Sequence, residues 1–219
     1  MCQPNYPRTV LINIGITQRV EVVESYQETR DCLDQKWSLF AQEAGFNLLP
    51  LATLAPQQVE EYVKDSHLSG LILSGGNSIA SLNPEAKDCS PKRDAFEKEL
   101  IRVAISHKLP LLGVCRGMQY LNVYFAGHLT AIKHHVGVRH ALLNANNNYS
   151  LPAEINSFHN WSIHPNDLAQ ELRVVATDKQ GNIEAFEHVN TAILGIMWHP
   201  ERETPFNQLD IQLFRKHLL

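Results

Sequence analysis

A single cysteine stands between two glycines where an apolar run meets a helical pattern. In the segment 111–119, LLGVCRGMQ, Gly113 and Gly117 flank Cys115 at a spacing of two residues. A nucleophile that projects from a sharp strand-to-helix turn needs small neighbours at both positions, because larger side chains would collide there. The start of a helix also favours a thiolate and offers main-chain N–H groups to a developing oxyanion. Cys115 is therefore a candidate nucleophile, and a buried cysteine in a tight turn is the alternative.

Two other segments carry groups that such a nucleophile would need. In the segment WHPE, His199 follows an apolar run, and Glu201 comes two residues later, where it could hydrogen-bond to the imidazole and orient it. Gly75 and Gly76 end another apolar run, LILSGG, where a main-chain N–H could reach the same oxyanion. Taken singly, a surface His-Pro turn and a plain strand-ending turn explain these segments as well.

Alternating strand-like and helical patterns predict the scaffold that would bring these groups together. Strand-like runs in the first half cover residues 9–15, 46–51, 69–76 and 108–114, and helical patterns cover 25–44, 54–66 and 93–107. This alternation predicts a mostly parallel sheet covered by helices on both faces. Short strand-like runs at 128–132, 136–143, 152–156, 172–177, 183–187 and 192–198 predict a smaller antiparallel extension, before a last helix at 207–218. We expect one domain over residues 1–219.

Composition excludes several classes of protein. A formal net charge of −4 argues against a general nucleic-acid binder, and no apolar run approaches the roughly 18 residues that a membrane span requires. The first residues show no targeting signal. The cysteines are Cys2, Cys32, Cys89 and Cys115, which are widely spaced and contain no C-x-x-C pair. This spacing favours a reducing cytoplasm and argues against a zinc site and against disulfide bonds. We expect no metal and no cofactor, and oligomeric state is left open.

The three motifs in order, SGG, GVCRGMQ and WHPE, resemble the class I glutamine amidotransferase-like superfamily over nearly the whole chain. The resemblance implies a three-layer, flavodoxin-like α/β sandwich and a Cys-His-Glu triad that cleaves the γ-amide of a glutamyl group. Cys115 would be the nucleophile, His199 the general base and acid, and Glu201 the residue that orients it. The oxyanion would be bound by main-chain N–H groups of Gly75, Gly76 and Arg116.

Further segments resemble the γ-glutamyl hydrolase branch of that superfamily, the γ-glutamyl-γ-aminobutyrate hydrolase type. The motif RDAFE at 93–97 precedes the nucleophile strand, and INSFHN at 155–160 resembles a segment that approaches the active site. Three of its residues become candidate substrate contacts: Asn156, Ser157 and His159. Asn160 and Trp161 depart from the branch pattern, which has a histidine and a glutamine there. Gln119, one helical turn after Cys115, could hold the glutamyl group or lie on a helix surface.

Two more stretches resemble the γ-glutamyl-CDP-amidate hydrolases of capsular phosphoramidate biosynthesis, GITQRVEVVESYQETRDCLDQKW at 15–37 and KHHVGVRH at 133–140. The resemblance implies release of glutamate and cytidine diphosphoramidate. Five cationic donors in this stretch could bind a pyrophosphate leaving group: Lys133, His134, His135, Arg139 and His140. The alternative is that they lie on a solvated loop. Arg19, Tyr26 and Arg30 could join them, although surface charge on a helix is the simpler explanation.

Three functions follow from these motifs. The leading one is a free-standing γ-glutamyl hydrolase that works through a thioester on a small-molecule substrate, with a nucleotide conjugate as the best match. The second is a glutaminase subunit that supplies ammonia to a separate synthase. The third is a catalytically silent binding module, which the joint presence of Cys115, His199 and Glu201 argues against.

Overall fold

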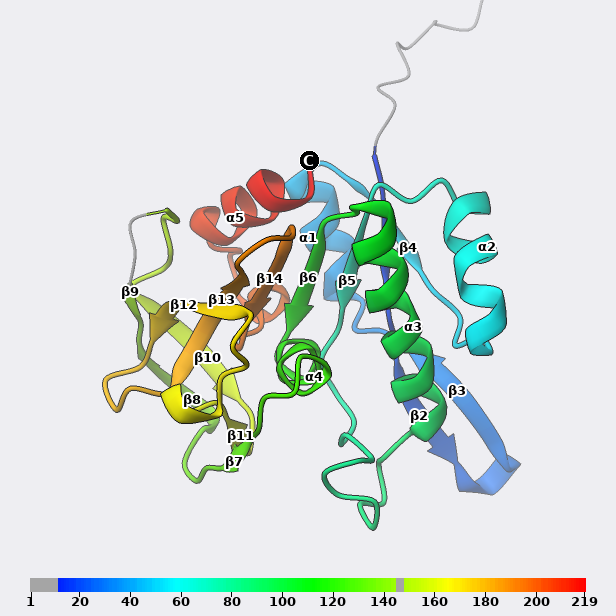
Figure 1. Ribbon diagram of the computed structural model, residues 1–219, viewed down its shortest axis with the longest axis horizontal. Coiled ribbons are helices and arrows are strands. Elements are labelled where there is room, and N and C mark those ends of the chain that lie inside the picture. Colours follow the sequence, from blue (N-terminus) through cyan, green and yellow to red (C-terminus); the bar gives the residue numbers. More distant parts are fainter. Residues whose placement is uncertain (1–11, 145–147) are drawn as a thin grey trace, which may run out of the picture.

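The computed structural model describes residues 12–144 and 148–219. Within these residues the central sheet has eight strands in the order β4-β1-β5-β6-β14-β13-β12-β9 (Figure 1). Their bounds are β4 Asn47–Pro50, β1 Asn13–Ile16, β5 Gly70–Leu73, β6 Leu111–Val114, β14 Ile193–Ile196, β13 Ile183–His188, β12 Leu172–Thr177 and β9 Leu143–Asn144. The pairings from β4 to β14 are parallel, and those from β14 to β9 are antiparallel. The predicted fold class, a mostly parallel sheet with an antiparallel extension, is confirmed.

Helices cover both faces of this sheet. Their bounds are α1 Lys36–Ala44, α2 Val59–Asp65, α3 Pro91–His107, α4 Arg116–Tyr124 and α5 Gln208–Leu218. Side chains of α1 and α5 share one core with Ile72 of β5, whereas α2, α3 and α4 share the other core with Leu71 and Leu73. Neighbouring residues of one strand thus enter different cores, as the alternation of side chains along a strand requires. The result is a three-layer sandwich.

Shorter elements lie around the sheet. Three two-stranded pairs accompany it: β2 Arg19–Val23 with β3 Glu28–Cys32, β8 Val136–Ala141 with β10 Glu154–Phe158, and β7 Thr130–Ala131 with β11 Trp161–Ser162. Single 3₁₀ turns cover η1 Glu24–Tyr26, η2 Pro56–Gln58, η3 Pro165–Asp167 and η4 Pro200–Arg202. The pair β8–β10 crosses beside β13 and β12 (Figure 1).

The helix predicted over 25–44 is wrong in its first part. Residues 19–32 form the β2–β3 hairpin, and the helix begins only at Lys36. Almost all of the hairpin is exposed, so its charged residues resemble the outer face of a helix, while Val20, Val22 and Thr29 favour extended backbone. The strand predicted over 9–15 is β1 from Asn13 onward, and residues 1–11, including Cys2, lie outside the described ranges.

The parallel strands β5, β6 and β14 bring the chemical motifs together. Their register aligns Leu73 with Gly113 and Val114 with Ile196, so the three strands end at the same edge of the sheet. The chain leaves these ends through Ser74, Cys115 and Met197 respectively. Segments distant in sequence therefore meet at the edge where α/β sheets place functional groups.

Candidate active site

Cys115 occupies a strained turn between β6 and α4. Its φ of 52° and ψ of −106° are rare for a residue with a side chain, and its main-chain N–H donates to the Ile196 carbonyl at 2.8 Å. The glycine at position 117 is a steric requirement, because a Cβ there would overlap the main-chain carbonyl of Leu73 on β5. The predicted elbow geometry is therefore present. Cys115 is mostly buried, and it interacts with a specific partner, the imidazole of His199.

His199 and Glu201 form a buried pair next to this thiol. The Nδ1 atom of His199 lies 2.7 Å from Oε1 of Glu201, which directs the other ring nitrogen toward Cys115. Burial alone would lower the pKa of His199, but the charges and hydrogen bonds of Cys115 and Glu201 outweigh it and raise that pKa to about 9. The imidazole therefore carries a proton at neutral pH.

Asn156 holds the main chain of His199. Its Oδ1 accepts from the N–H of His199 at 2.9 Å, and its Nδ2 donates to the His199 carbonyl at 2.8 Å and to Glu203 Oε1 at 2.7 Å. The side-chain amide is thus occupied by protein groups on both ends. Sequence analysis expected Asn156 to contact substrate, whereas the structure places it behind His199 as a positioning residue.

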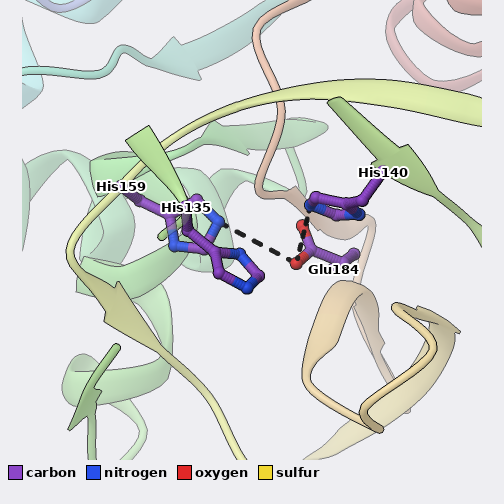
Figure 2. Close-up of side chains that lie close together, drawn as sticks. All are labelled: His135, His140, His159 and Glu184. Atoms are coloured by element: carbon purple, nitrogen blue, oxygen red, sulfur yellow. Dashed lines mark ion pairs between the residues drawn. The ribbon is translucent and has the colours of Figure 1, made fainter. Parts of the chain in front are cut away.

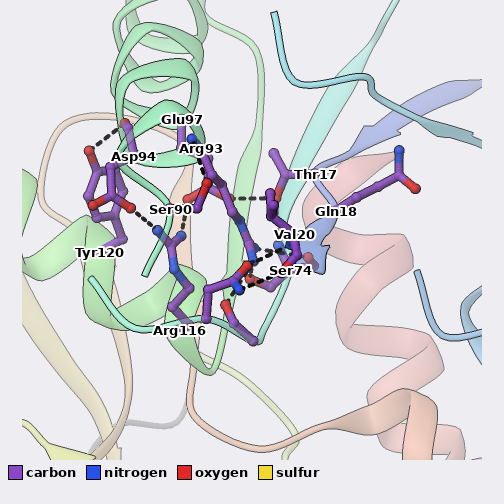
Figure 3. A network of polar contacts seen from close by, with 12 residues as sticks. Thr17, Gln18, Val20, Ser74, Ser90, Arg93, Asp94, Glu97, Arg116 and Tyr120 are labelled. Carbon is purple, nitrogen blue, oxygen red and sulfur yellow. Dashed lines mark hydrogen bonds and ion pairs between the residues drawn. The ribbon is translucent and has the colours of Figure 1, made fainter. Parts of the chain in front are cut away.

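The loop after β5 is braced by Arg93, a fully buried residue on α3. Its guanidinium donates to the carbonyls of Ser74 at 2.8 Å, Gly75 at 3.2 Å and Gly76 at 2.7 Å (Figure 3). Among the described residues, no main-chain hydrogen bond from the N–H of Gly75 or Gly76 is found. Because the carbonyls are drawn toward α3, these N–H groups are left to bind another acceptor.

Gly75 itself lies against the side chains of His199 and Cys115. A Cβ at this position would lie 2.7 Å from Cε1 of His199 and 3.6 Å from Cβ of Cys115. Only glycine therefore allows the loop to approach the pair this closely. The expected meeting of the SGG, GVCRG and WHPE segments is a feature of the structure.

The motif RDAFE braces the elbow from the same helix. Asp94 and Glu97 both pair with the buried guanidinium of Arg116, the residue after Cys115, and Glu97 also pairs with Arg93 (Figure 3). Burial would raise the pKa of Glu97, yet the charges of Arg116 and Arg93 hold it below its ordinary value. From the sequence, the motif is identified only by its resemblance to the γ-glutamyl hydrolase branch, and no role is predicted for Arg93. The available signal was an Arg–Glu pair four residues apart on the buried side of a helix.

Comparison with known proteins places the chain in a family. The model of the peptidase C26 family matches residues 12–150 and 130–201. The chain belongs to the peptidase C26 family. Membership makes it a hydrolase of carbon–nitrogen amide bonds, related to the class I glutamine amidotransferases.

Individual relatives support this family, and a solved structure shares the fold. The chain is 38% identical over 200 residues to the γ-glutamyl-CDP-amidate hydrolase of Campylobacter jejuni, covering 90% of this chain and 94% of that protein. It is 27% identical to the glutamine-hydrolyzing GMP synthase subunit of Methanococcus vannielii over 72% of this chain and 78% of that one. A crystal structure of a glutamine amidotransferase from Thermotoga maritima shares the fold, with a TM-score of 0.63 and 18% identity over 94% of this chain and 84% of that one. None of the helices in residues 12–144 and 148–219 combines the length and apolar character of a membrane span.

Two cavities of this peptidase C26 chain meet at the Cys115–His199 pair. The first, of about 200 Å³, contains Cys115 and has a mixed lining that includes the polar side chains of Gln119, His159 and Asn160 and the charged residues Asp88 and Arg116. The second, of about 320 Å³, contains His199 and is flanked by Arg19 and Arg202. Gln119 is buried and its amide donates to the Trp161 carbonyl at 3.0 Å, so it is a cavity-wall residue and not a surface one.

The segment 133–140 lies around a third cavity that does not include Cys115. All five expected cationic donors line it, but they do not act as one anion-binding group. Arg139 pairs with Glu203 at 2.7 Å and with Glu154 at 3.3 Å. Burial lowers the pKa of His135, and His140 faces a buried glutamate instead of solvent. Lys133 and His134 are exposed.

The remaining expected residues have more local roles. Ser157 Oγ donates to the His135 carbonyl at 2.6 Å, and His159 Nδ1 lies 2.8 Å from the Trp161 carbonyl. Burial lowers the pKa of His159 to about 4, so its imidazole is neutral. Tyr26 and Arg30 lie on the exposed β2–β3 hairpin, where Arg30 pairs with Glu28. Neither of them lines the two cavities at Cys115 and His199.

Proposed function

We propose that this chain is a free-standing γ-glutamyl hydrolase that acts through Cys115 and whose leaving group is a nucleotide phosphoramidate, as in γ-glutamyl-CDP-amidate. The observation that carries the proposal is the strained Cys115 elbow beside the buried His199–Glu201 pair. The relative from Campylobacter jejuni, which bears that activity in its name and aligns over nearly the full length of both chains, supports the choice of substrate.

The proposed reaction has two halves. The Cys115 thiolate attacks the γ-glutamyl carbonyl, and the oxyanion accepts hydrogen bonds from main-chain N–H groups of the Gly75–Gly76 loop and of Arg116. The carbon–nitrogen bond breaks as the imidazolium of His199 gives its proton to the departing nitrogen. The neutral imidazole then takes a proton from water, which attacks the thioester and releases glutamate and the free thiolate. No step requires a metal or an organic cofactor.

The two cavities suggest where each half of the substrate lies. The polar side chains around Gln119 suit the glutamyl group. The second cavity presents Arg19 and Arg202 to an anionic leaving group, although Asp34 and Glu201 also line it. Arg19 is half exposed, and within residues 12–144 and 148–219 its one ion pair is with Glu21, so a phosphate can compete for it. We place the pyrophosphate here and not at residues 133–140, because that segment lines a cavity without Cys115 or His199.

The test compares glutamate release from γ-glutamyl-CDP-amidate, γ-glutamyl-γ-aminobutyrate and glutamine. We expect the nucleotide conjugate to have the highest kcat/KM, and Cys115→Ala to abolish release from all three while the circular dichroism spectrum is unchanged. Full activity of Cys115→Ala would remove the proposed mechanism. Rapid turnover of the aminobutyrate conjugate with no turnover of the nucleotide would remove the proposed substrate.

Arg19 tests the position of the leaving group. Arg19→Ala should raise KM for the nucleotide conjugate about 10-fold and leave KM for glutamine unchanged, since a pair of charge-assisted hydrogen bonds is lost only with the anionic substrate. Arg30→Ala is the matched control, because Arg30 lies on the same hairpin but lines neither cavity. Equal effects of the two substitutions would contradict the placement.

A glutaminase that serves a separate synthase is the second candidate, favoured by the likeness to the GMP synthase subunit of Methanococcus vannielii. In that case glutamine would be the best of the three substrates, and the synthase would stimulate its turnover. The same three-substrate comparison therefore separates the two functions.

A further inference from the structure

Three histidines and one glutamate gather beside the active site without a role in the proposed reaction. His135 and His140 belong to the segment that leads into and forms β8, His159 follows β10, and Glu184 lies on β13. One potential ligand atom from each residue lies within 4.8 Å of the other three. Figure 2 shows the three imidazole rings around the Glu184 carboxylate.

Five buried polar atoms of this cluster lack hydrogen-bond partners among the described residues. Glu184 is 1% exposed, and neither of its carboxylate oxygens is hydrogen-bonded within the part of the chain that the structure describes. The same holds for Nδ1 of His135 and for Nε2 of both His140 and His159. Buried polar atoms are nearly always paired, and an unpaired buried carboxylate is especially costly. Five such atoms in one place indicate that a further group belongs between them.

Two of the opposite ring nitrogens already have acceptors. His159 Nδ1 lies 2.8 Å from the Trp161 carbonyl, and His140 Nδ1 lies 3.4 Å from the Ala141 carbonyl. Nε2 of His135 lies 3.8 Å from the Asp178 carboxylate. The carbonyls at His159 and His140 favour the tautomers that keep a lone pair on Nε2, the nitrogen nearest Glu184, whereas the distance from His135 to Asp178 is too long for a hydrogen bond. Histidines that bind metals are held in this way by main-chain carbonyls and carboxylates.

We propose that His135, His140, His159 and Glu184 bind one divalent transition-metal ion, zinc by preference, in a closed four-coordinate site. His140 Nε2 and His159 Nε2 lie 3.6 and 3.9 Å from Glu184 Oε1, and ligands about 2.1 Å from a tetrahedral zinc ion are separated by about 3.3 Å. The site closes around an ion when the remaining separations, which are at most 4.8 Å, shorten to about this distance. Three imidazoles suit zinc and not calcium or magnesium, which require oxygen ligands.

The sequence predicts no metal site, since the cysteines lack ligand spacing. The proposed histidine and glutamate ligands lie between residues 135 and 184, so no short sequence motif identifies them. From the sequence, the histidines of residues 133–140 are predicted only to bind an anion. Their convergence on Glu184 is a product of the β8–β10 pair lying beside β13.

The bound ion would tie the β8–β10 pair to the central sheet. That pair carries Asn156, which holds the main chain of His199, and Phe158, whose ring packs edge-on against the His199 ring at 6.0 Å. Four protein ligands leave no open position for substrate, so the role is structural. The ion would stabilise the fold and keep His199 in place without entering the reaction. This proposal stands independently of the substrate.

The first experiment measures metal content and stability together. Tag-free protein is stripped with a chelator, returned to one equivalent of zinc and dialysed, and its zinc is measured by mass spectrometry. We expect about one zinc ion per chain and a thermal midpoint several degrees above that of the stripped protein. The Cys115→Ala variant should retain the same zinc, which excludes binding at the thiol. A stripped protein that neither retains zinc nor gains stability from it would overturn the proposal.

Substitutions in the cluster test the ligands. His140→Gln and Glu184→Gln should each lose the zinc and the zinc-dependent rise in the thermal midpoint. His164→Gln is the control, because His164 lines the adjacent cavity but contributes no atom to the cluster. If Glu184→Gln binds zinc as the unmodified chain does, the carboxylate is not a ligand and the proposal is wrong.

Cobalt keeps the proposal testable if a variant fails to fold. The unmodified chain loaded with Co²⁺ should show the intense visible absorption of a tetrahedral ion, with charge-transfer bands of thiolate ligation absent. A weak octahedral spectrum would instead indicate adventitious surface binding and overturn the proposal. A cluster in which a protonated Glu184 simply donates to one histidine would give no cobalt signal above that of Glu184→Gln.

Discussion

At the scale of single residues, His199 lies between two groups that favour its charged form. The Glu201 carboxylate contacts Nδ1, and the Cys115 side chain interacts with the ring from the other side. A protonated imidazole is the form that can deliver a proton to a departing nitrogen. The activity should therefore persist into alkaline solution and end when this proton is lost.

Glu201→Gln should shift the alkaline limb of the pH profile. Because the folded-state pKa of His199 is raised to about 9, the imidazolium is present below that pH and is lost above it, so kcat/KM should fall above about pH 9. Without the negative charge of Glu201 the pKa of His199 is lower, and the fall should begin at lower pH. The measurement is kcat/KM between about pH 6 and about pH 10.

Glu203→Gln is the control for this profile. Glu203 accepts from Asn156 and pairs with Arg139 but does not contact the imidazole. Its substitution should leave the alkaline limb in place even if the rate decreases. An unchanged limb in Glu201→Gln would show that another group titrates in this range.

At the scale of elements, α3 and α4 hold the site through contacts that tolerate no added atoms. Arg93 on α3 restrains the loop after β5, and Asp94 and Glu97 restrain Arg116 at the start of α4. The first turn of α4 packs directly on the end of β5, because Gly117 has no side chain. The position of the nucleophile therefore depends on how closely α4 approaches β5.

Gly117→Ala should destabilise the protein although alanine is the better helix former. In an open helix this change stabilises by roughly 0.5–1 kcal/mol. Here the new Cβ would overlap the carbonyl oxygen of Leu73, a main-chain atom that cannot move aside without displacing β5. We expect the free energy of unfolding to fall by about 3 kcal/mol and the activity to be lost.

Denaturant titration measures this change in the free energy of unfolding. Val123→Ala, a half-buried position on the same helix, provides the comparison and should cost about 1 kcal/mol. A neutral or stabilising Gly117→Ala would show that the elbow has room which the structure does not give it.

At the scale of the whole molecule, the layer formed by α1 and α5 supports the site from the opposite face of the sheet. Trp198, the residue before His199, is buried in this layer, and its Nε1 donates to Asp210 of α5 at 2.9 Å. Burial raises the pKa of Asp210 to about 7, although the hydrogen bond from Trp198 opposes the rise. The acid is therefore kept in a setting that favours its neutral form.

Asp210→Asn should stabilise the protein, and more at high pH than at low pH. A carboxyl whose folded pKa of about 7 exceeds its ordinary value of 3.8 contributes stability at low pH that is lost as pH rises through about 7. Asparagine keeps an acceptor for Trp198 and never ionises. We expect a gain of roughly 1–3 kcal/mol near pH 8 and little change near pH 5.

Urea titrations at the two pH values measure this difference. Asp65→Asn, at the exposed end of α2, is the control and should show no dependence on pH. A gain from Asp210→Asn that is the same at both values would mean that Asp210 stays in one protonation state in this range.

Local patterns in the sequence were sufficient to predict the elbow and the strand ends that carry the chemistry. Gly113 lies against atoms of its own strand–turn–helix unit, and the two-residue spacing of His199 and Glu201 lets one turn close the pair. Both are short-range constraints, so they are visible in the sequence. The sequence does not predict the hairpin at 19–32, because none of its residues is buried and its strands therefore show no burial pattern.

Only the tertiary structure decided what the segment 133–140 does. Side chains alternate along β8, so Arg139 faces Glu203 while the neighbouring His140 faces Glu184. A dense run of cationic residues in the sequence is thereby divided between an ion pair with Glu203 and the cluster at Glu184. The brace of Arg93 on the Gly75–Gly76 loop and the cluster at Glu184 likewise join segments distant along the chain. The sequence predicts the elbow at Cys115 and the His199–Glu201 pair because each lies within one short segment. Only the fold brings these segments together, because β6 and β14 lie side by side, and the remaining contacts likewise depend on which strands are neighbours.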